Sequence, residues 1–130
     1  MELIHIPMSP GELLDKITIL EIKSERINDA EKVANVRREL ELLNATWAEA
    51  VTSDKTVERL HRELKAINEA LWEIEDDIRD KERVKEFDER FIELARAVYF
   101  TNDKRAAAKK ELNLHLGSQI VEEKSYQDYN

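Results

Sequence analysis

The sequence contains no cysteine, only two glycines and two prolines, and three histidines among its 130 residues. The absence of cysteine excludes disulfide bonds, cysteine-based zinc sites and thiol catalysis. The three histidines are far apart along the chain, so a histidine-based metal site is not expected. The scarcity of glycine and proline leaves few residues for tight turns and is typical of a mostly helical chain.

Long apolar runs are also missing, as are a recognisable signal peptide and an arginine-rich transit segment. We therefore expect no membrane insertion and a cytoplasmic location. The net charge is -8, and an acidic chain repels phosphate backbones, so nucleic-acid binding is not expected. The length predicts one domain over residues 1–130 that can bury a sizeable core.

Common catalytic signatures are absent as well. The sequence has no glycine-rich phosphate loop, no H-E-x-x-H and no G-x-S-x-G. It therefore indicates no catalytic residue, no cofactor and no metal, and it favours a role other than catalysis.

The best-defined element is the stretch from Ser9 to Ile27, which predicts a helix over 9–27. Ser9 can cap the helix, Pro10 suits its first position, and Glu12 completes a capping box. Apolar residues recur at helical spacing along one side. This seam consists of Leu13, Ile17, Leu20 and Ile27.

The rest of the chain predicts helices over 28–51, 54–80 and 86–116, with an extended arm over 1–8 and a tail over 117–130. The helix over 54–80 has the most regular pattern, with steps of three and four that are typical of antiparallel packing. Its seam consists of Val57, Leu60, Leu64, Ile67, Leu71, Ile74 and Ile78. The predicted fold class is an all-α antiparallel bundle of about four long helices.

Two boundaries remain open at the sequence level. The segment 80–86 contains neither glycine nor proline, so the helix over 54–80 and the next helix could form one long helix. The last helix could also break at 101–103, where Thr, Asn and Asp cap readily. A break would turn Arg105 and Lys109 outward, whereas an unbroken helix would place both on the apolar face. Buried cations need anionic partners. The candidate partners are Glu12, Asp15 and Glu75.

Basic residues on the first and last helices form the candidate ligand site. Cations gathered in a cleft would bind a small carboxylate or phosphate. These residues are Lys16, Lys23, Arg26, Arg105 and Lys109. The alternative is structural, with each cation paired to a carboxylate, as in Glu12 with Lys16.

Self-association is expected from apolar residues outside the seams. Ile19 and Ile22 lie nearly opposite the seam of the first helix, and Leu42 lies away from the seam of the second. Four helices would not cover all three residues, and uncovered apolar surface marks an interface. A homodimer or a protein partner would cover them.

Two distant resemblances are confined to single elements. The first helix resembles that of the small all-α chorismate mutases, although the register slips by a residue or two. Acidic pairs such as Glu73/Asp76 and Glu86/Glu89 are similar to signatures of all-helical, magnesium-dependent nucleotide pyrophosphohydrolases, but they occur in the reverse order. The chorismate mutase resemblance rests on Leu14-Asp15, Ile17, Ile19-Leu20 and Arg26.

A closer resemblance covers nearly the whole chain. It is carried by SPGELLDKITILEIKSERI, LWEIEDDIR, FIELARAVYFTNDKRAAAKKELN and GSQIVEEKSY. These segments resemble a family of short bacterial proteins of unknown function. The resemblance implies a bacterial, cytoplasmic, helical domain and supplies no catalytic residue. Two functions are compatible with the sequence: a non-catalytic interaction module, or a bundle that binds or transforms a small anion.

Overall fold

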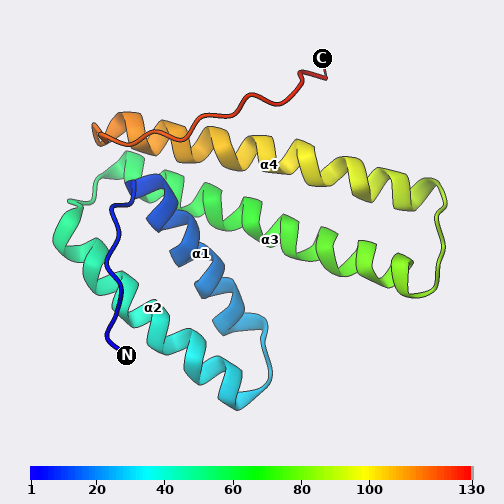
Figure 1. Ribbon diagram of the computed structural model, residues 1–130, viewed down its shortest axis with the longest axis horizontal. Helices are drawn as coiled ribbons and strands as arrows, with labels where there is room; N and C mark the ends of the chain where they lie inside the picture. Colours follow the sequence, from blue (N-terminus) through cyan, green and yellow to red (C-terminus); the bar gives the residue numbers. More distant parts are fainter. Residues whose placement is uncertain (130) are drawn as a thin grey trace.

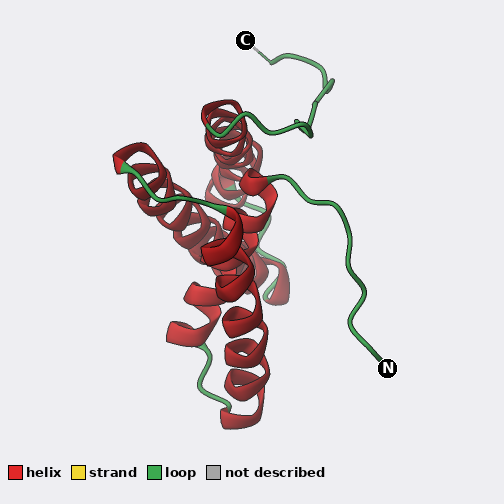
Figure 2. Ribbon diagram, turned by 90° about the vertical axis from the view of Figure 1, so that its left-hand side faces the viewer, coloured by secondary structure: helices red, strands yellow, loops and turns green. Residues whose placement is uncertain are grey.

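A computed structural model describes residues 1–129, which form four α-helices and no strand (Figures 1 and 2). The prediction of an all-α antiparallel bundle is confirmed. Asn130, the last residue of the predicted tail, lies outside the described residues. The helices are α1 (Pro10–Arg26), α2 (Ala30–Ala50), α3 (Lys55–Arg83) and α4 (Glu89–His115).

Each helix begins at a side chain that accepts a hydrogen bond from an otherwise unpaired backbone N–H. Ser9 Oγ accepts from Glu12 N at 3.2 Å, as the capping box predicts. The cap of α2 is Asp29, one residue beyond the expected start at 28, and it accepts from Lys32 N at 3.0 Å. Asp54 and Asp88 cap α3 and α4 in the same way.

Helix α1 is the centre of the fold. Within the described residues it is the one helix that packs against all three others, whereas α2 packs along α1 and α3 packs along α4 (Figure 1). Side chains from three helices form the main core. This core contains Leu14, Val57, Leu60, Leu64, Ala108 and Leu112, with Trp47 of α2 packed against it.

The turn between α3 and α4 separates two helices that the sequence could have joined. Helix α3 ends at Arg83, and Glu86 N donates to Lys81 O at 3.0 Å. Lys85 takes a left-handed φ of 57°, a conformation that cannot continue an α-helix. The chain therefore folds back into an antiparallel hairpin.

Helix α4 runs without a break through residues 101–103, so Arg105 and Lys109 face inward. Beyond the end of α1, the α3–α4 hairpin projects from the rest of the molecule (Figure 1). We call this part the distal hairpin; it comprises residues 70–83 of α3 and 89–100 of α4.

The two terminal segments run outside the helical layers (Figure 2). In the arm, Leu3, Ile4 and Ile6 remain mostly exposed. The tail returns along α4, where the Tyr129 ring packs against Tyr99 and Phe100. No helix within residues 1–129 has the length and apolar character that crossing a membrane requires.

Candidate functional site

A buried ion pair joins α1 to α4. Asp15, which is 1% exposed, receives a bidentate interaction from Arg105. The Nε–H of Arg105 donates to Asp15 Oδ1 at 2.8 Å, and Nη2 donates to Oδ2. The Asp15 carboxylate raises the pKa of Arg105 above its ordinary value, while partial burial opposes the rise. The pair thus neutralises a carboxylate that has no access to water.

Two neutral side chains complete the network around Asp15. The Asn68 amide of α3 donates to Asp15 Oδ1 at 2.9 Å and to Thr18 Oγ1 at 3.0 Å. The Thr18 hydroxyl donates to the Asp15 backbone oxygen at 2.8 Å. No buried side-chain polar atom within residues 1–129 lacks a hydrogen-bond partner. The network therefore ties three helices together without stranding a polar group.

Lys109 forms a second link between α4, α1 and the tail. Its Nζ lies 2.8 Å from Glu12 Oε2 and 2.9 Å from Glu122 Oε2. Burial favours a lower pKa for Lys109, but the two carboxylates outweigh it and raise the pKa above the ordinary value. The same contact lowers the pKa of Glu122. Lys109 therefore stays protonated and holds the tail against the helices.

The network requires α1 and α4 to approach closely, and Gly11 permits this. Its backbone N–H donates to Asn113 Oδ1 at 2.7 Å. A Cβ atom at Gly11 would lie 2.6 Å from the backbone oxygen of Lys109, closer than real side chains come. A side chain at Gly11 would push the start of α1 away from α4.

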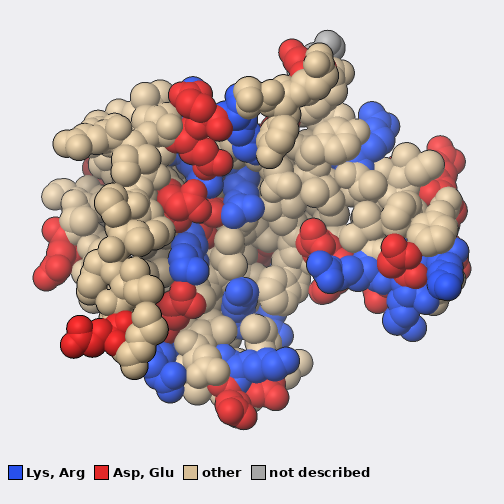
Figure 3. All heavy atoms as spheres, in the orientation of Figure 1, with Lys and Arg blue, Asp and Glu red and all other residues tan. Residues whose placement is uncertain are grey.

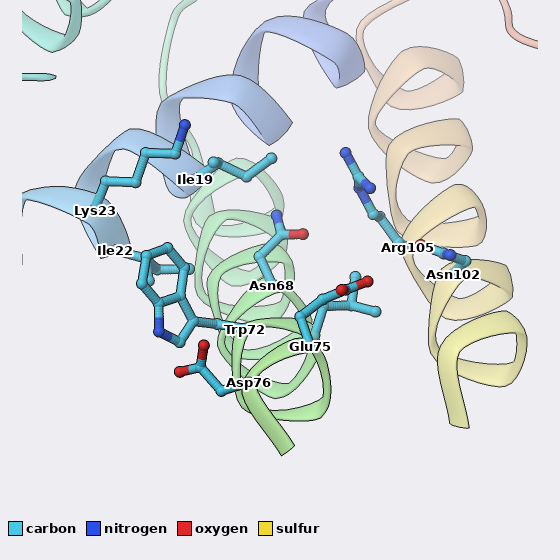
Figure 4. Close-up of a pocket in the computed structure, with 10 residues that line it drawn as sticks. Ile19, Ile22, Lys23, Asn68, Trp72, Glu75, Asp76, Asn102 and Arg105 are labelled. Atoms are coloured by element: carbon cyan, nitrogen blue, oxygen red, sulfur yellow. The ribbon is translucent and has the colours of Figure 1, made fainter. Parts of the chain in front are cut away.

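A pocket of about 400 Å³ opens beside the ion pair, where α1 crosses the α3–α4 hairpin (Figure 4). Its apolar wall includes Ile19 and Ile22 from α1 and the half-buried Trp72 from α3. Its polar groups come from all three helices. They are Lys23, Asn68, Glu75, Asp76, Asn102 and Arg105.

Arg105 also borders a second, smaller pocket of about 230 Å³. Glu12 and Lys109 line that pocket, together with Glu122 and Lys124 of the tail. The guanidinium therefore lies between two hollows, and its side chain is 30% exposed although its carboxylate partner is buried.

The structure separates the five predicted ligand-binding cations. Lys16 pairs with Glu39 of α2 at 3.1 Å. Arg26 lies 3.6 Å from Glu69 and 3.4 Å from Glu73. Lys23 and Arg105 share the larger pocket, and Arg105 and Lys109 share the smaller one. Four of the five cations thus have carboxylate partners, and Lys23 makes no side-chain ion pair within residues 1–129.

The sequence pattern identified Asp15 and Glu12 as partners of the inward cations, but it missed Glu122, the second partner of Lys109, and the rest of the network. Asp15 and Glu12 were among the three candidate carboxylates. Asn68, Thr18 and Asn113 carried no signal beyond being polar residues next to apolar seams. Such a residue on the flank of a seam indicates a buried hydrogen bond, but its partner depends on how the helices cross.

In this arrangement Arg105 and Asp15 position α1 against α4. The Asp15 carboxylate is neutralised by Arg105, and no group of three or more acidic, histidine or cysteine side chains within residues 1–129 is placed to hold a metal ion. Acidic and basic side chains are interleaved on the face drawn in Figure 3. That face does not present an extended surface of one charge.

Comparison with models of protein families places the chain in a family. Residues 4–129 match a family described as one of unknown function (DUF6165). No curated protein and no solved structure matches the chain.

Proposed function

This chain belongs to a family of unknown function, and we propose that it acts as a non-catalytic interaction module whose distal hairpin binds a second copy of the chain. The proposal places the module in the bacterial cytoplasm. It rests on the burial pattern along α3, on the distribution of charge along the hairpin and on the pairing of the cations described above.

The observation that carries the proposal is a change of burial along one continuous seam. At the start of α3, Leu60 and Leu64 are fully buried beneath α1 and α4. One heptad further on, Leu71, Ile74 and Ile78 are half-buried. The heptad pattern continues while the cover of α1 ends: Leu71 still borders the pocket walled by Ile19 and Ile22 of α1, and the hairpin then projects past the end of α1 (Figure 1). The projecting part of the distal hairpin therefore has apolar surface without a third helix.

Exposed apolar side chains at the end of the hairpin support the same conclusion. Val84 and Phe87 in the turn are 52% and 57% exposed, and Ile92 of α4 is 56% exposed. Two identical two-helix hairpins packed about a two-fold axis would together form a four-helix bundle, and this bundle would bury the exposed apolar side chains.

The charges along the hairpin are distributed in a way that suits a two-fold arrangement. Four of the five residues in 73–77 are acidic. At the end of α3 and in the turn that follows, the cations Arg83 and Lys85 make no ion pair within residues 1–129. If two hairpins cross antiparallel, the turn of each copy lies against the acidic segment of the other, and opposite charges meet.

The pairing of the cations supports this function over the other candidate, a small-anion site. Lys109 is held between the carboxylates of Glu12 and Glu122. Lys16 and Arg26 lie against carboxylates outside the pocket, so these three cations do not gather around one anion. A small-anion site would therefore depend on Lys23 and Arg105 alone.

Sedimentation velocity of the Ile92→Glu variant tests the proposal. The wild type should sediment as a dimer at micromolar concentration, and Ile92→Glu should be monomeric because a charge would be buried in the interface. Leu114→Glu is the matched control, since Leu114 is 64% exposed on the same helix but at its other end. A monomeric wild type, or loss of the dimer in Leu114→Glu alone, would refute the role of the hairpin.

A further inference from the structure

The pocket beside the ion pair has charges of opposite sign on different sides. Figure 4 shows Lys23 of α1 and Arg105 of α4 facing each other across the upper part of the view, with the carboxylates of Glu75 and Asp76 of α3 below them. Ile19 lies between the two cations, and the Trp72 ring lies between Lys23 and Asp76. A volume of about 400 Å³ falls within the range of pockets that bind small molecules.

Several of these charged groups retain binding capacity. Neither Lys23 nor Asp76 makes a side-chain ion pair within residues 1–129. Arg105 uses its Nε and Nη2 atoms to bind Asp15, which leaves further N–H donors of the guanidinium unused. Within residues 1–129, the one ion-pair partner of Glu75 is Arg79, one turn along α3 and mostly exposed, and such a pair is weak.

The mixture of signs limits the class of ligand. A simple anion would be attracted by Lys23 and Arg105 but repelled by Glu75 and Asp76. A simple cation would meet the opposite arrangement, and a purely apolar molecule would desolvate the charges without pairing them. A molecule that carries both charges and an apolar body can pair with the cations and with the carboxylates and can pack against the apolar residues of the pocket.

We propose that this pocket binds a small zwitterion with an apolar body, such as a free α-amino acid with a branched aliphatic or aromatic side chain. The carboxylate pairs with Lys23 and Arg105, the ammonium group pairs with Asp76 and Glu75, and the apolar side chain packs against Trp72. The proposed site is built from one copy of the chain, so a monomeric variant can still bind the ligand.

The two tryptophans allow a direct test by NMR, with the wild-type protein and leucine as the probe. Trp72 lines the pocket, whereas Trp47 belongs to α2 and packs against the core, away from the pocket. Leucine should shift the Trp72 indole signal in a saturable manner and leave the Trp47 signal in place. Equal shifts of both signals, or no saturable shift of Trp72, would overturn the proposal.

Two analogues of leucine distinguish a zwitterion site from a site for one charge. 4-Methylpentanoate lacks the ammonium group, and 3-methylbutylamine lacks the carboxylate. Each should bind at least about tenfold more weakly than leucine, which corresponds to about 1.4 kcal/mol for the lost ion pair. Binding of 4-methylpentanoate as tight as that of leucine would show an anion site instead.

Paired variants separate local contacts from general charge effects. Lys23→Gln and Asp76→Asn should each weaken leucine binding several-fold. Their controls are Lys16→Gln on the same helix, which pairs with Glu39 outside the pocket, and Asp80→Asn, one turn further along α3. The Ile92→Glu variant should bind leucine at least as tightly as the wild type, because in a monomer no partner turn faces Glu75 and Asp76. Equal losses in the pocket variants and their controls would contradict the proposed contacts.

Discussion

At the residue scale, Arg105 is the side chain whose loss should have the largest effect. Arg105→Ala would leave the Asp15 carboxylate, 1% exposed, without a counter-charge. Breaking a buried pair by removing one partner costs about 3–5 kcal/mol. We expect a loss of that size in the free energy of unfolding, measured by urea denaturation.

Two variants make this prediction specific. Lys104→Ala removes a cation from the exposed face of the same helix and should change stability by no more than about 0.5 kcal/mol. Adding Asp15→Asn to Arg105→Ala should restore part of the loss, because no buried carboxylate is then left without a counter-charge. Equal effects of Lys104→Ala and Arg105→Ala would show that the ion pair does not brace the fold.

Tyr129 provides a pH-dependent test of the docked tail. Its hydroxyl donates to Asp103, and this bond raises the pKa of Tyr129 from 10.0 to about 12. A raised tyrosine pKa in the folded state means that the contact is fully present below pH 10.0 and is lost as pH rises through about 12.

Ultraviolet titration of the phenol groups measures this directly. The chain has three tyrosines, and we expect one ionisation near 12 that disappears in Tyr129→Phe. If the titration curve of Tyr129→Phe retains the step near 12, that step belongs to another tyrosine and the tail contact is not present in solution.

At the element scale, stability should fall along α3 as its seam loses the cover of α1. Leu64 is 0% exposed, and Leu64→Ala should cost about 2–5 kcal/mol, as at other buried leucines. Leu71→Ala removes the same atoms one heptad later, where the side chain is half-buried, and should cost clearly less. If urea denaturation showed equal losses in the free energy of unfolding for the two variants, the proposed decrease in burial along α3 would be contradicted.

The sequence predicted the helices better than their burial. Capping residues and apolar spacing are local properties, so the start of α1 at Ser9 and the heptads of α3 could be read directly. The left-handed turn at Lys85 was not predicted, because the segment lacks the glycine that usually marks such a conformation. The side chains of Arg105 and Lys109 could be assigned partners only if α4 was unbroken, and local preference alone did not decide this.

At the scale of the whole molecule, the crossing of α1 over the α3–α4 hairpin determines which apolar residues are buried and which cations share a pocket. The sequence did not predict this crossing. It covers Ile22, which is 1% exposed, so this residue does not contribute the exposed surface on which self-association was expected. Leu42 remains 46% exposed. The crossing also creates the pocket that combines Lys23 with Arg105 and leaves Lys16 and Arg26 outside it. Such long-range placement depends on helix packing angles, which apolar spacing leaves undetermined.

The most direct test of the proposed function uses the absence of cysteine, because a single introduced cysteine can be labelled without side reactions. Arg79→Cys places a spin label on an exposed position of the distal hairpin, where the native side chain is 77% exposed. Ala48→Cys places the control label on the exposed side of α2. If two copies pair through their hairpins, pulsed dipolar spectroscopy should detect a defined label-to-label distance for Arg79→Cys, and this signal should vanish when Ile92→Glu is added. A background signal alone for Arg79→Cys at concentrations where the protein sediments as a dimer would contradict pairing through the hairpin.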